Sequence, residues 1–304
     1  MSRPQGPRRP PPPPGLLVVD KPPGMTSHDV VARVRRIMGT RKVGHAGTLD
    51  PMATGVLVLG IERATKLLGH LALDRKTYLA TIVLGSSTTT DDAEGEQLTE
   101  ASAEEVAAVT DEAVAAGIAT LTGDIQQVPS AVSAVKVDGK RAYARVRAGE
   151  QLDLPPRPVT VYRFDLLVLR REEGRIELDA VVDCSSGTYV RALARDLGAG
   201  LGAGGHLGAL RRTTVGPFAL AAARTLEQLE EKPELSFSLD AAVAKAFPRR
   251  DVGTGLAKAV QYGQKVPSAG IDGTYGVFAP DGRVLALAVD EGGVARSVVV
   301  LSPA

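Results

Sequence analysis

The sequence predicts an α+β protein, because amphipathic helical segments alternate with short β-branched runs that pair as hairpins. Residues 27–38 carry apolar side chains at helical spacing. Residues 159–169 and 175–184 are two strand-like runs on either side of a Glu-Glu-Gly turn. Beyond residue 250 the runs are again strand-like. At about 100–200 residues per domain, a chain of 304 residues indicates one large domain or two unequal ones.

The first ordered element is expected at Gly15, as a short strand over residues 16–19. The following Asp-Lys-Pro-Pro-Gly must turn, because two prolines remove two backbone donors. A helix over residues 27–38 comes next, with Thr26 or Ser27 as its cap and Gly39 as the left-handed residue that ends it. Basic residues around the far end of this helix either complement its dipole or contact phosphates; they are Arg33, Arg35, Arg36, Arg41 and Lys42.

The middle of the chain predicts a buried strand at residues 78–84 and a helix that starts at the capping box Ser102-x-x-Glu105. After the hairpin, residues 189–197 are expected to form a helix that stops at Gly198. The pattern breaks at residues 247–250. Strand-like runs then follow at 275–279, 283–289 and 297–301, the first two around a Pro-Asp-Gly turn, which gives a β-rich module of roughly 50 residues.

The net charge of +1 is a cancellation between two parts of the chain. Residues 77–135 contain ten acidic residues and no Lys or Arg, so the remainder has 36 basic against 25 acidic residues. The balanced total argues against a uniformly basic nucleic-acid coat protein and against an acidic solvating chain, but it does not exclude a basic face. The single cysteine, Cys184, cannot form an internal disulfide, and no apolar run approaches the ~20 residues of a membrane helix. We expect a soluble cytoplasmic protein.

The first 14 residues hold seven prolines and three arginines without an apolar core, which is not the pattern of a signal peptide. We interpret them as a disordered tail, with an SH3-type ligand or a polyanion-binding arm as alternatives. Residues 200–205 match G-x-G-x-x-G but follow a predicted helix, so a helix end and loop is favoured over dinucleotide binding. The four histidines lack metal-ligand spacing, and we expect no metal or other cofactor.

Two segments have the composition of functional loops. Residues 44–51, Gly-His-Ala-Gly-Thr-Leu-Asp-Pro, predict a tight non-helical loop that fixes the direction of the Asp50 carboxylate. An Asx turn ahead of Pro51 would explain the same residues. Residues 184–191 enter a helix from a small-residue loop and place Tyr189 two residues before Arg191. The alternative is that this tyrosine packs in the core and the arginine is solvated.

Together these segments closely resemble the TruB family of tRNA pseudouridine synthases, over about residues 15–215. The matching stretches are GLLVVDKPPGMTSHDVV (15–31), KVGHAGTLDPMATGVLVLGIERATKLL (42–68), KTY (76–78), VPSAVSAVKVDGKRAYARVRAGE (128–150), CSSGTYVRALARDLG (184–198) and GGHLGALRR (204–212). The combination is very specific, because six motifs occur in the family's order and spacing.

The resemblance implies isomerisation of the uridine at position 55, in the T-loop of tRNA, to pseudouridine without a cofactor. It places the family's catalytic aspartate on Asp50, its active-site tyrosine on Tyr78 and its carboxylate-pairing arginine on Arg191. Further residues near the substrate fall on Lys21, His45, Tyr189 and Leu210, and those of a basic thumb on Lys136, Lys140, Arg141 and Arg145. The tRNA T-arm is the implied partner, with no membrane, no obligate protein partner and a monomeric state. A tRNA-folding chaperone role could accompany catalysis.

The implied fold is a catalytic domain of pseudouridine-synthase type with a mixed, largely antiparallel sheet at residues 15–247. It follows the tail at 1–14 and contains a thumb insertion at about 127–152. A small β-rich domain resembling RNA-binding PUA domains would follow at 248–304, on a weaker match of length, hairpin pattern and position.

The reaction explains why these residue types occur together. The target base must be flipped out of its stack, and an aromatic ring can receive its face. Asp50 must be ionised to act as a nucleophile or as the base that removes a sugar proton, and the sequence leaves both routes open. A nearby guanidinium such as Arg191 would keep it charged. In the family, Tyr78 is the candidate that removes the C5 proton.

The sequence departs from the family after the strand of Tyr78. Where the family often has T-D-T-x-D, residues 88–92 read Thr-Thr-Thr-Asp-Asp, so only Asp92 remains in register.

Two other functions compete with a stand-alone synthase: a guide-RNA-dependent enzyme of the dyskerin/Cbf5 type, and a tRNA-binding chaperone without chemistry. The thumb-like residues 129–150 argue against the first, and the intact Asp50, Tyr78 and Arg191 argue against the second.

Overall fold

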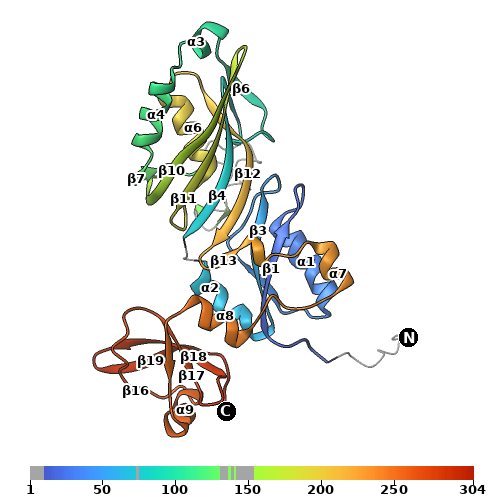
Figure 1. Cartoon of the computed structure of the whole chain (residues 1–304), viewed down its shortest axis with the longest axis vertical. Helices are drawn as coiled ribbons and strands as arrows, with labels where there is room; N and C mark the ends of the chain where they lie inside the picture. Colours follow the sequence, from blue (N-terminus) through green and yellow to red (C-terminus); the bar gives the residue numbers. More distant parts are fainter. Residues whose placement is uncertain (1–9, 73–74, 131–135, 138–139, 142–153) are drawn as a thin grey trace. The chain divides into compact units, whose positions relative to one another are not determined.

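A computed structural model describes residues 10–72, 75–130, 136–137, 140–141 and 154–304. The chain divides into two compact units (Figure 1). The first unit comprises Met1–Pro51, Gly55–Ala72 and Gly216–Ala304, and the second comprises Met52–Thr54 and Leu73–Val215. Within the described ranges, no helix is both long enough and apolar enough to span a membrane. The α+β class predicted from the sequence is confirmed.

The first unit is built on an antiparallel strand pair, β1 (Gly15–Lys21) and β3 (Thr54–Ile61). Strand β14 (Phe237–Ser238) pairs with the start of β1, and β2 (Val43–Ala46) pairs with the end of β3. The apolar residues 16–19 of β1 are completely buried. A continuous apolar run is expected for a strand that is covered on both faces.

Helix α1 (Ser27–Met38) has the predicted bounds. Thr26 is its cap, in a reciprocal capping box with Asp29, and Gly39 ends it with a left-handed φ of 65°. Arg33 makes ion pairs with Glu227 and Glu230, so this member of the basic cluster has an internal partner. The shorter elements of this unit are the 3-10 helices Glu62–Leu67 and Leu220–Ala222, α2 (Leu68–Leu71), β13 (Phe218–Ala219), α7 (Leu226–Glu231) and α8 (Leu239–Ala246).

The C-terminal module of the first unit is a separate five-stranded sheet in the order β15-β17-β18-β19-β16. Its elements are β15 (Arg249–Asp251), α9 (Thr254–Gln261), β16 (Val266–Pro267), β17 (Tyr275–Phe278), β18 (Val284–Glu291) and β19 (Val294–Val300). Strand β15 runs parallel to β17, and the other neighbours are antiparallel. The predicted hairpin at residues 280–282 is confirmed. A cluster around Tyr275, Val277 and Leu285 forms the core of this module.

The second unit contains five antiparallel strands in the order β12-β4-β11-β10-β7, with α6 lying behind them in Figure 1. Their bounds are β4 (Lys76–Leu84), β7 (Gly123–Gln127), β10 (Arg157–Glu172), β11 (Arg175–Cys184) and β12 (Gly205–Val215). The remaining elements are β5 (Ser86–Thr88), β6 (Gln97–Glu100), α3 (Ala103–Ala107), α4 (Asp111–Thr120), the two-residue strands β8 (Lys136–Val137) and β9 (Lys140–Arg141), and α6 (Val190–Gly200).

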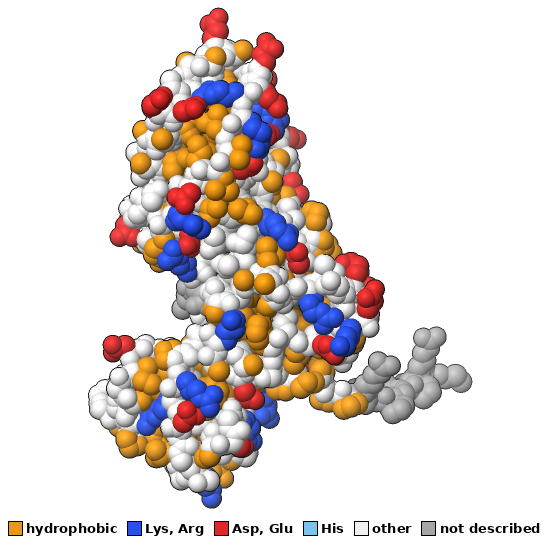
Figure 2. Space-filling model, in the orientation of Figure 1, with side chains coloured by type: hydrophobic (Ala, Val, Ile, Leu, Met, Phe, Trp, Pro, Cys, Tyr) orange, Lys and Arg blue, Asp and Glu red, His pale blue; other side chains and the backbone are white. Residues whose placement is uncertain are grey.

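The two faces of these strands differ in exposure. Tyr78, Ala80 and Ile82 alternate along β4 and are buried, whereas Leu79 between them is 42% exposed. Leu167 on β10 is 55% exposed. Figure 2 shows hydrophobic side chains gathered on the near face of this part of the molecule.

The structure corrects two local predictions. Gly44, His45 and Ala46 are not part of a loop, because they form most of β2 and pair with β3. Helix α6 also does not stop at Gly198 but continues to Gly200. A Cβ at Gly198 would lie 2.2 Å from the nitrogen of Gly205. This glycine therefore permits close packing of α6 against β12 rather than ending the helix.

Candidate active site

The loop that carries Asp50 joins β2 to β3 in the first unit, and Asp50 itself is half-buried. Both neighbours of Asp50 are held by the segment 21–27. The Ser27 hydroxyl bonds to the backbone of Leu49, and the Gly24 amide donates to the carbonyl oxygen of Pro51 at 2.9 Å. Hydrogen bonds from outside the loop thus hold the backbone on both sides of Asp50, and the direction of its carboxylate stays a prediction.

Lys21, predicted near the substrate, is completely buried at the end of β1. Its Nζ donates to the carbonyl oxygens of Pro22, Met25 and Pro51 at 2.9, 2.6 and 3.0 Å. A buried ammonium group requires such partners. In the first unit Lys21 therefore ties the Asp50 loop to the turn that follows β1.

His45 lies on β2 opposite Leu59. Its ring meets the ring of His28 edge to face, with the ring centres 5.4 Å apart. His28 is exposed on the first turn of α1. The Asp50 loop thus has an imidazole on the strand that leads into it.

In the second unit, Tyr78 lies on β4 with only 7% of its surface exposed. The neighbouring strand β12 places Arg212 opposite Tyr78 and Leu210 opposite Ala80. A hollow of about 470 Å³ is lined by Leu210 together with Met52, Thr54, Leu79 and other residues of this unit. The predicted pocket residue Leu210 therefore borders a cavity.

Tyr189 is the N-cap residue of α6, so the sequence pattern correctly placed it at a helix start. Its backbone is held on both sides by the side chain of Gln127, which is 2% exposed. The Tyr189 amide donates to Gln127 Oε1 at 2.8 Å, and Gln127 Nε2 donates to the Tyr189 carbonyl oxygen at 3.1 Å. Sequence reasoning missed Gln127, which is the last residue of β7.

Arg191, in the first turn of α6, is 4% exposed, so the alternative of a solvated arginine is wrong. Its guanidinium donates to the Thr90 carbonyl oxygen at 2.8 Å and lies 3.4 Å from the Asp92 carboxylate. Asp91, at a φ of 59°, pairs with Arg195 at 3.1 Å. Residues 88–92 depart from T-D-T-x-D, yet Asp91 and Asp92 both form ion pairs with arginines of α6. The sequence pattern did not reveal this role.

The thumb residues are described only in part. Strands β8 and β9 form an antiparallel pair in which Lys136 lies opposite Arg141 and Val137 opposite Lys140. Arg145 lies outside the described residues, as do most of the remaining thumb and residues 1–9 of the tail.

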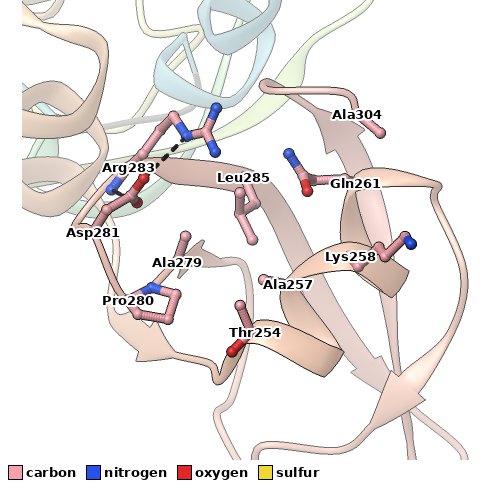
Figure 3. A pocket seen from close by; sticks show the side chains of 10 residues that line it. All are labelled: Thr254, Ala257, Lys258, Gln261, Ala279, Pro280, Asp281, Arg283, Leu285 and Ala304. Carbon is pink, nitrogen blue, oxygen red and sulfur yellow. Dashed lines mark hydrogen bonds and ion pairs between the residues drawn. The ribbon is translucent and has the colours of Figure 1, made fainter.

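Lys21, His45 and Asp50 belong to the first unit, and Tyr78, Tyr189, Arg191 and Leu210 to the second. The assembly of these two groups into one site stays a prediction. A further cavity of about 450 Å³ lies in the C-terminal module, where it is lined by residues such as Lys258, Gln261 and Arg283 (Figure 3). None of the predicted site residues lines it.

Three family models match the chain in succession. The TruB family pseudouridylate synthase N-terminal domain matches residues 35–190. The tRNA pseudouridylate synthase B C-terminal domain matches residues 191–242, and the tRNA pseudouridine synthase II C-terminal domain matches residues 247–302.

Similar proteins match over the full length. The tRNA pseudouridine synthase B of Rhodococcus jostii (strain RHA1) is 58% identical over 305 residues, which cover 100% of this chain and 99% of the relative. That of Nocardia farcinica (strain IFM 10152) is 60% identical over 296 residues, covering 97% and 96%.

Among solved structures, the chain resembles one in a Cbf5-Nop10-Gar1 complex, with a TM-score of 0.72 and 26% identity over 95% of this chain and 85% of that one. It also resembles one in the archaeal box H/ACA sRNP Nop10-Cbf5 complex, with a TM-score of 0.69 and 25% identity over 95% and 86%. The matched family models, the full-length relatives and the shared fold confirm the resemblance seen in the motifs, and this chain belongs to the TruB family of pseudouridylate synthases.

Proposed function

We propose that this protein isomerises the uridine at position 55 of the tRNA T-loop to pseudouridine, with Asp50 as the essential carboxylate. The observation that carries the proposal is the position of Asp50. It lies in the HAGTLDP segment between Leu49 and Pro51, whose backbones are both held by buried side chains. The curated relatives named tRNA pseudouridine synthase B, at 58–60% identity, support tRNA as the substrate.

The chemistry requires that the bond between N1 of the base and the sugar breaks and that C5 becomes bonded to the same sugar carbon. Asp50 opens this sequence either by nucleophilic attack or by removal of a sugar proton. C5 finally loses its proton and N1 gains one, so the product is an isomer and no oxidant or reductant is consumed. Tyr78 receives the flipped base and serves as the base at C5.

Substrate recognition in this proposal depends on shape and phosphate contacts, because the major groove of RNA is too deep and narrow for side chains to read. The thumb contributes Lys136, Lys140, Arg141 and Arg145. The C-terminal module would add a second RNA contact as a PUA-like domain, and the T-arm stem-loop would be sufficient as substrate.

A stand-alone enzyme is favoured over a guide-RNA-dependent one. The curated relatives that cover almost the whole chain are 58–60% identical, against 25–26% for the matched chains of the two solved complexes that contain Cbf5. If the proposal is correct, the purified chain acts on T-arm RNA with no guide RNA and no second protein.

The decisive experiment uses T-arm RNA labelled with tritium at C5 of uracil. Wild-type protein should release tritium, whereas Asp50→Asn should release none. Asp165→Asn, at an exposed site on β10, is the matched control and should behave as wild type. No release by wild type, or full release by Asp50→Asn, contradicts the assignment. A refolding assay with the same Asp50→Asn protein tests separately for a chaperone role.

A further inference from the structure

The hydroxyl of Ser27 bonds to the loop that carries Asp50 rather than capping its own helix. The cap of α1 is complete without it: Thr26 Oγ1 accepts from the Asp29 amide at 3.1 Å, and the Thr26 amide donates to Asp29 Oδ2 at 2.9 Å. The sequence allowed either Thr26 or Ser27 as the cap. Because Thr26 takes that role, the Ser27 side chain is available for a contact 22 residues away.

The contact between Ser27 and Leu49 is double. The Leu49 amide donates to Ser27 Oγ at 2.9 Å, and Ser27 Oγ donates to the Leu49 carbonyl oxygen at 3.0 Å. Ser27 is completely buried and Leu49 is 4% exposed. A hydroxyl can donate once and accept as well, so one side chain satisfies both backbone groups of a single residue. The peptide that leads into Asp50 is thereby fixed.

The backbone on the other side of Asp50 is also held by hydrogen bonds. The carbonyl oxygen of Pro51 accepts from Lys21 Nζ at 3.0 Å and from the Gly24 amide at 2.9 Å. The proline ring also restricts the backbone at this position. Asp50 is therefore the residue between two anchored neighbours, and Ser27 supplies the anchor on its N-terminal side.

We propose that Ser27 is a positioning residue for the isomerisation, which it serves by fixing the direction of the Asp50 carboxylate through Leu49. The inference rests on the proposed function. A reacting group that is displaced by about 1 Å can lose ~100-fold in rate. Loop-borne catalytic groups depend on buried hydrogen bonds for their placement. Loss of the hydroxyl therefore slows the chemical step and leaves RNA binding in place.

The test compares Ser27→Ala with Thr26→Ala, a matched pair at adjacent positions of one helix start. Single-turnover tritium release gives the rate of the chemical step, and filter binding gives the Kd for T-arm RNA. We expect Ser27→Ala to lower the rate by ~10–100-fold with a Kd within about twofold of wild type. Thr26→Ala removes the helix cap but not the Leu49 contact, so its rate should stay within about threefold of wild type.

Conservative rescue separates positioning from stability. Ser27→Thr retains the hydroxyl and should recover most of the rate that Ser27→Ala loses. A Ser27→Ala rate within about threefold of wild type overturns the inference. The inference is also overturned if Ser27→Ala and Thr26→Ala lose rate equally and each loss of rate is proportional to the loss of Tm in that variant.

A measurement on wild-type protein applies even where Ser27→Ala does not fold. Hydrogen exchange at the Leu49 amide should be strongly protected, and exchange at the rate of an open loop overturns the inference. Failure of the inference is distinct from failure of the proposed function. Wild-type protein that releases no tritium contradicts the function, whereas tritium release that is insensitive to Ser27→Ala contradicts only the role of Ser27.

Discussion

The guanidinium of Arg191 lies 3.4 Å from the carboxylate of Asp92, and each side chain is only 5% exposed. The loop that carries Asp92 is itself fixed to β12, because the Ala93 amide and the Asp91 carbonyl oxygen both bond to the backbone of Leu207 at 3.0 Å. A charge buried to this extent requires a partner. Asp92 thus forms an ion pair with Arg191, which the family resemblance identifies as the partner of the catalytic aspartate.

Asp92→Ala should lower the free energy of unfolding by about 3 kcal/mol, because removal of one partner leaves a buried charge undercompensated. Asp165→Ala is the control, since its ion pair with Arg163 spans 3.6 Å between exposed side chains and should change stability by less than about 1 kcal/mol. Urea denaturation of both variants measures the difference. Similar losses in the two variants would show that Asp92 is not a buried anchor for Arg191.

Gly198→Ala should destabilise the second unit, because its Cβ would lie 2.2 Å from the Gly205 nitrogen. The backbones of α6 and β12 would have to separate, at a cost of about 1–3 kcal/mol. Gly200→Ala, two residues further along α6, meets nothing within 4 Å and should be neutral or stabilising by up to about 1 kcal/mol. Thermal melts should show a clearly lower Tm for Gly198→Ala and an unchanged or higher Tm for Gly200→Ala.

The C-terminal module should lose stability in acid through Asp290. Hydrogen bonds from the Tyr275 hydroxyl and from Ser268 hold the pKa of the Asp290 carboxyl well below its usual range. A depressed folded-state pKa gives stability that is present above the unfolded value, near ~4, and is lost as the pH falls toward the folded value.

Denaturation midpoints measured from pH 6 down to pH 3 test this pH dependence. In Asp290→Asn the acid-induced loss should be smaller than in wild type, and the midpoint at pH 6 should be lower. Asp281→Asn, in the exposed turn between β17 and β18, should follow the wild-type curve. If Asp290→Asn loses as much stability in acid as wild type does, Asp290 is not the cause of the acid sensitivity.

Neutralising the thumb should flatten the salt dependence of RNA binding. Replacement of Lys140, Arg141 and Arg145 by Gln removes three positive charges, and each lost phosphate contact lowers the slope of log K against log salt by about 0.7–0.9. Binding to T-arm RNA over a salt series measures the slope. Gln replacement of Arg33, which already pairs with Glu227 and Glu230, should change it much less. An unaltered slope in the triple variant would exclude these residues from the interface.

Local features of the fold were predictable from the sequence because their causes lie within a few residues. The bounds of α1 follow from its apolar spacing, the Thr26 capping box and the left-handed Gly39. The hairpin of β10 and β11 follows from two strand-like runs and a Glu-Glu-Gly turn. The candidate residues Asp50, Tyr78 and Arg191 came from the resemblance of six motifs to the TruB family.

Only the tertiary structure decided which segments and side chains are in contact with one another. Gly44–Ala46 became a strand because β3 offered a pairing edge, and α6 passed Gly198 because β12 lies against it. The partners of Arg191 lie about a hundred residues away on the chain, and Leu49 lies 22 residues after its partner Ser27. By itself the sequence determined α1, the hairpin of β10 and β11, and the chemistry of the candidate residues. The buried hydrogen bonds that orient them join distant segments, so they exist only once the chain has folded.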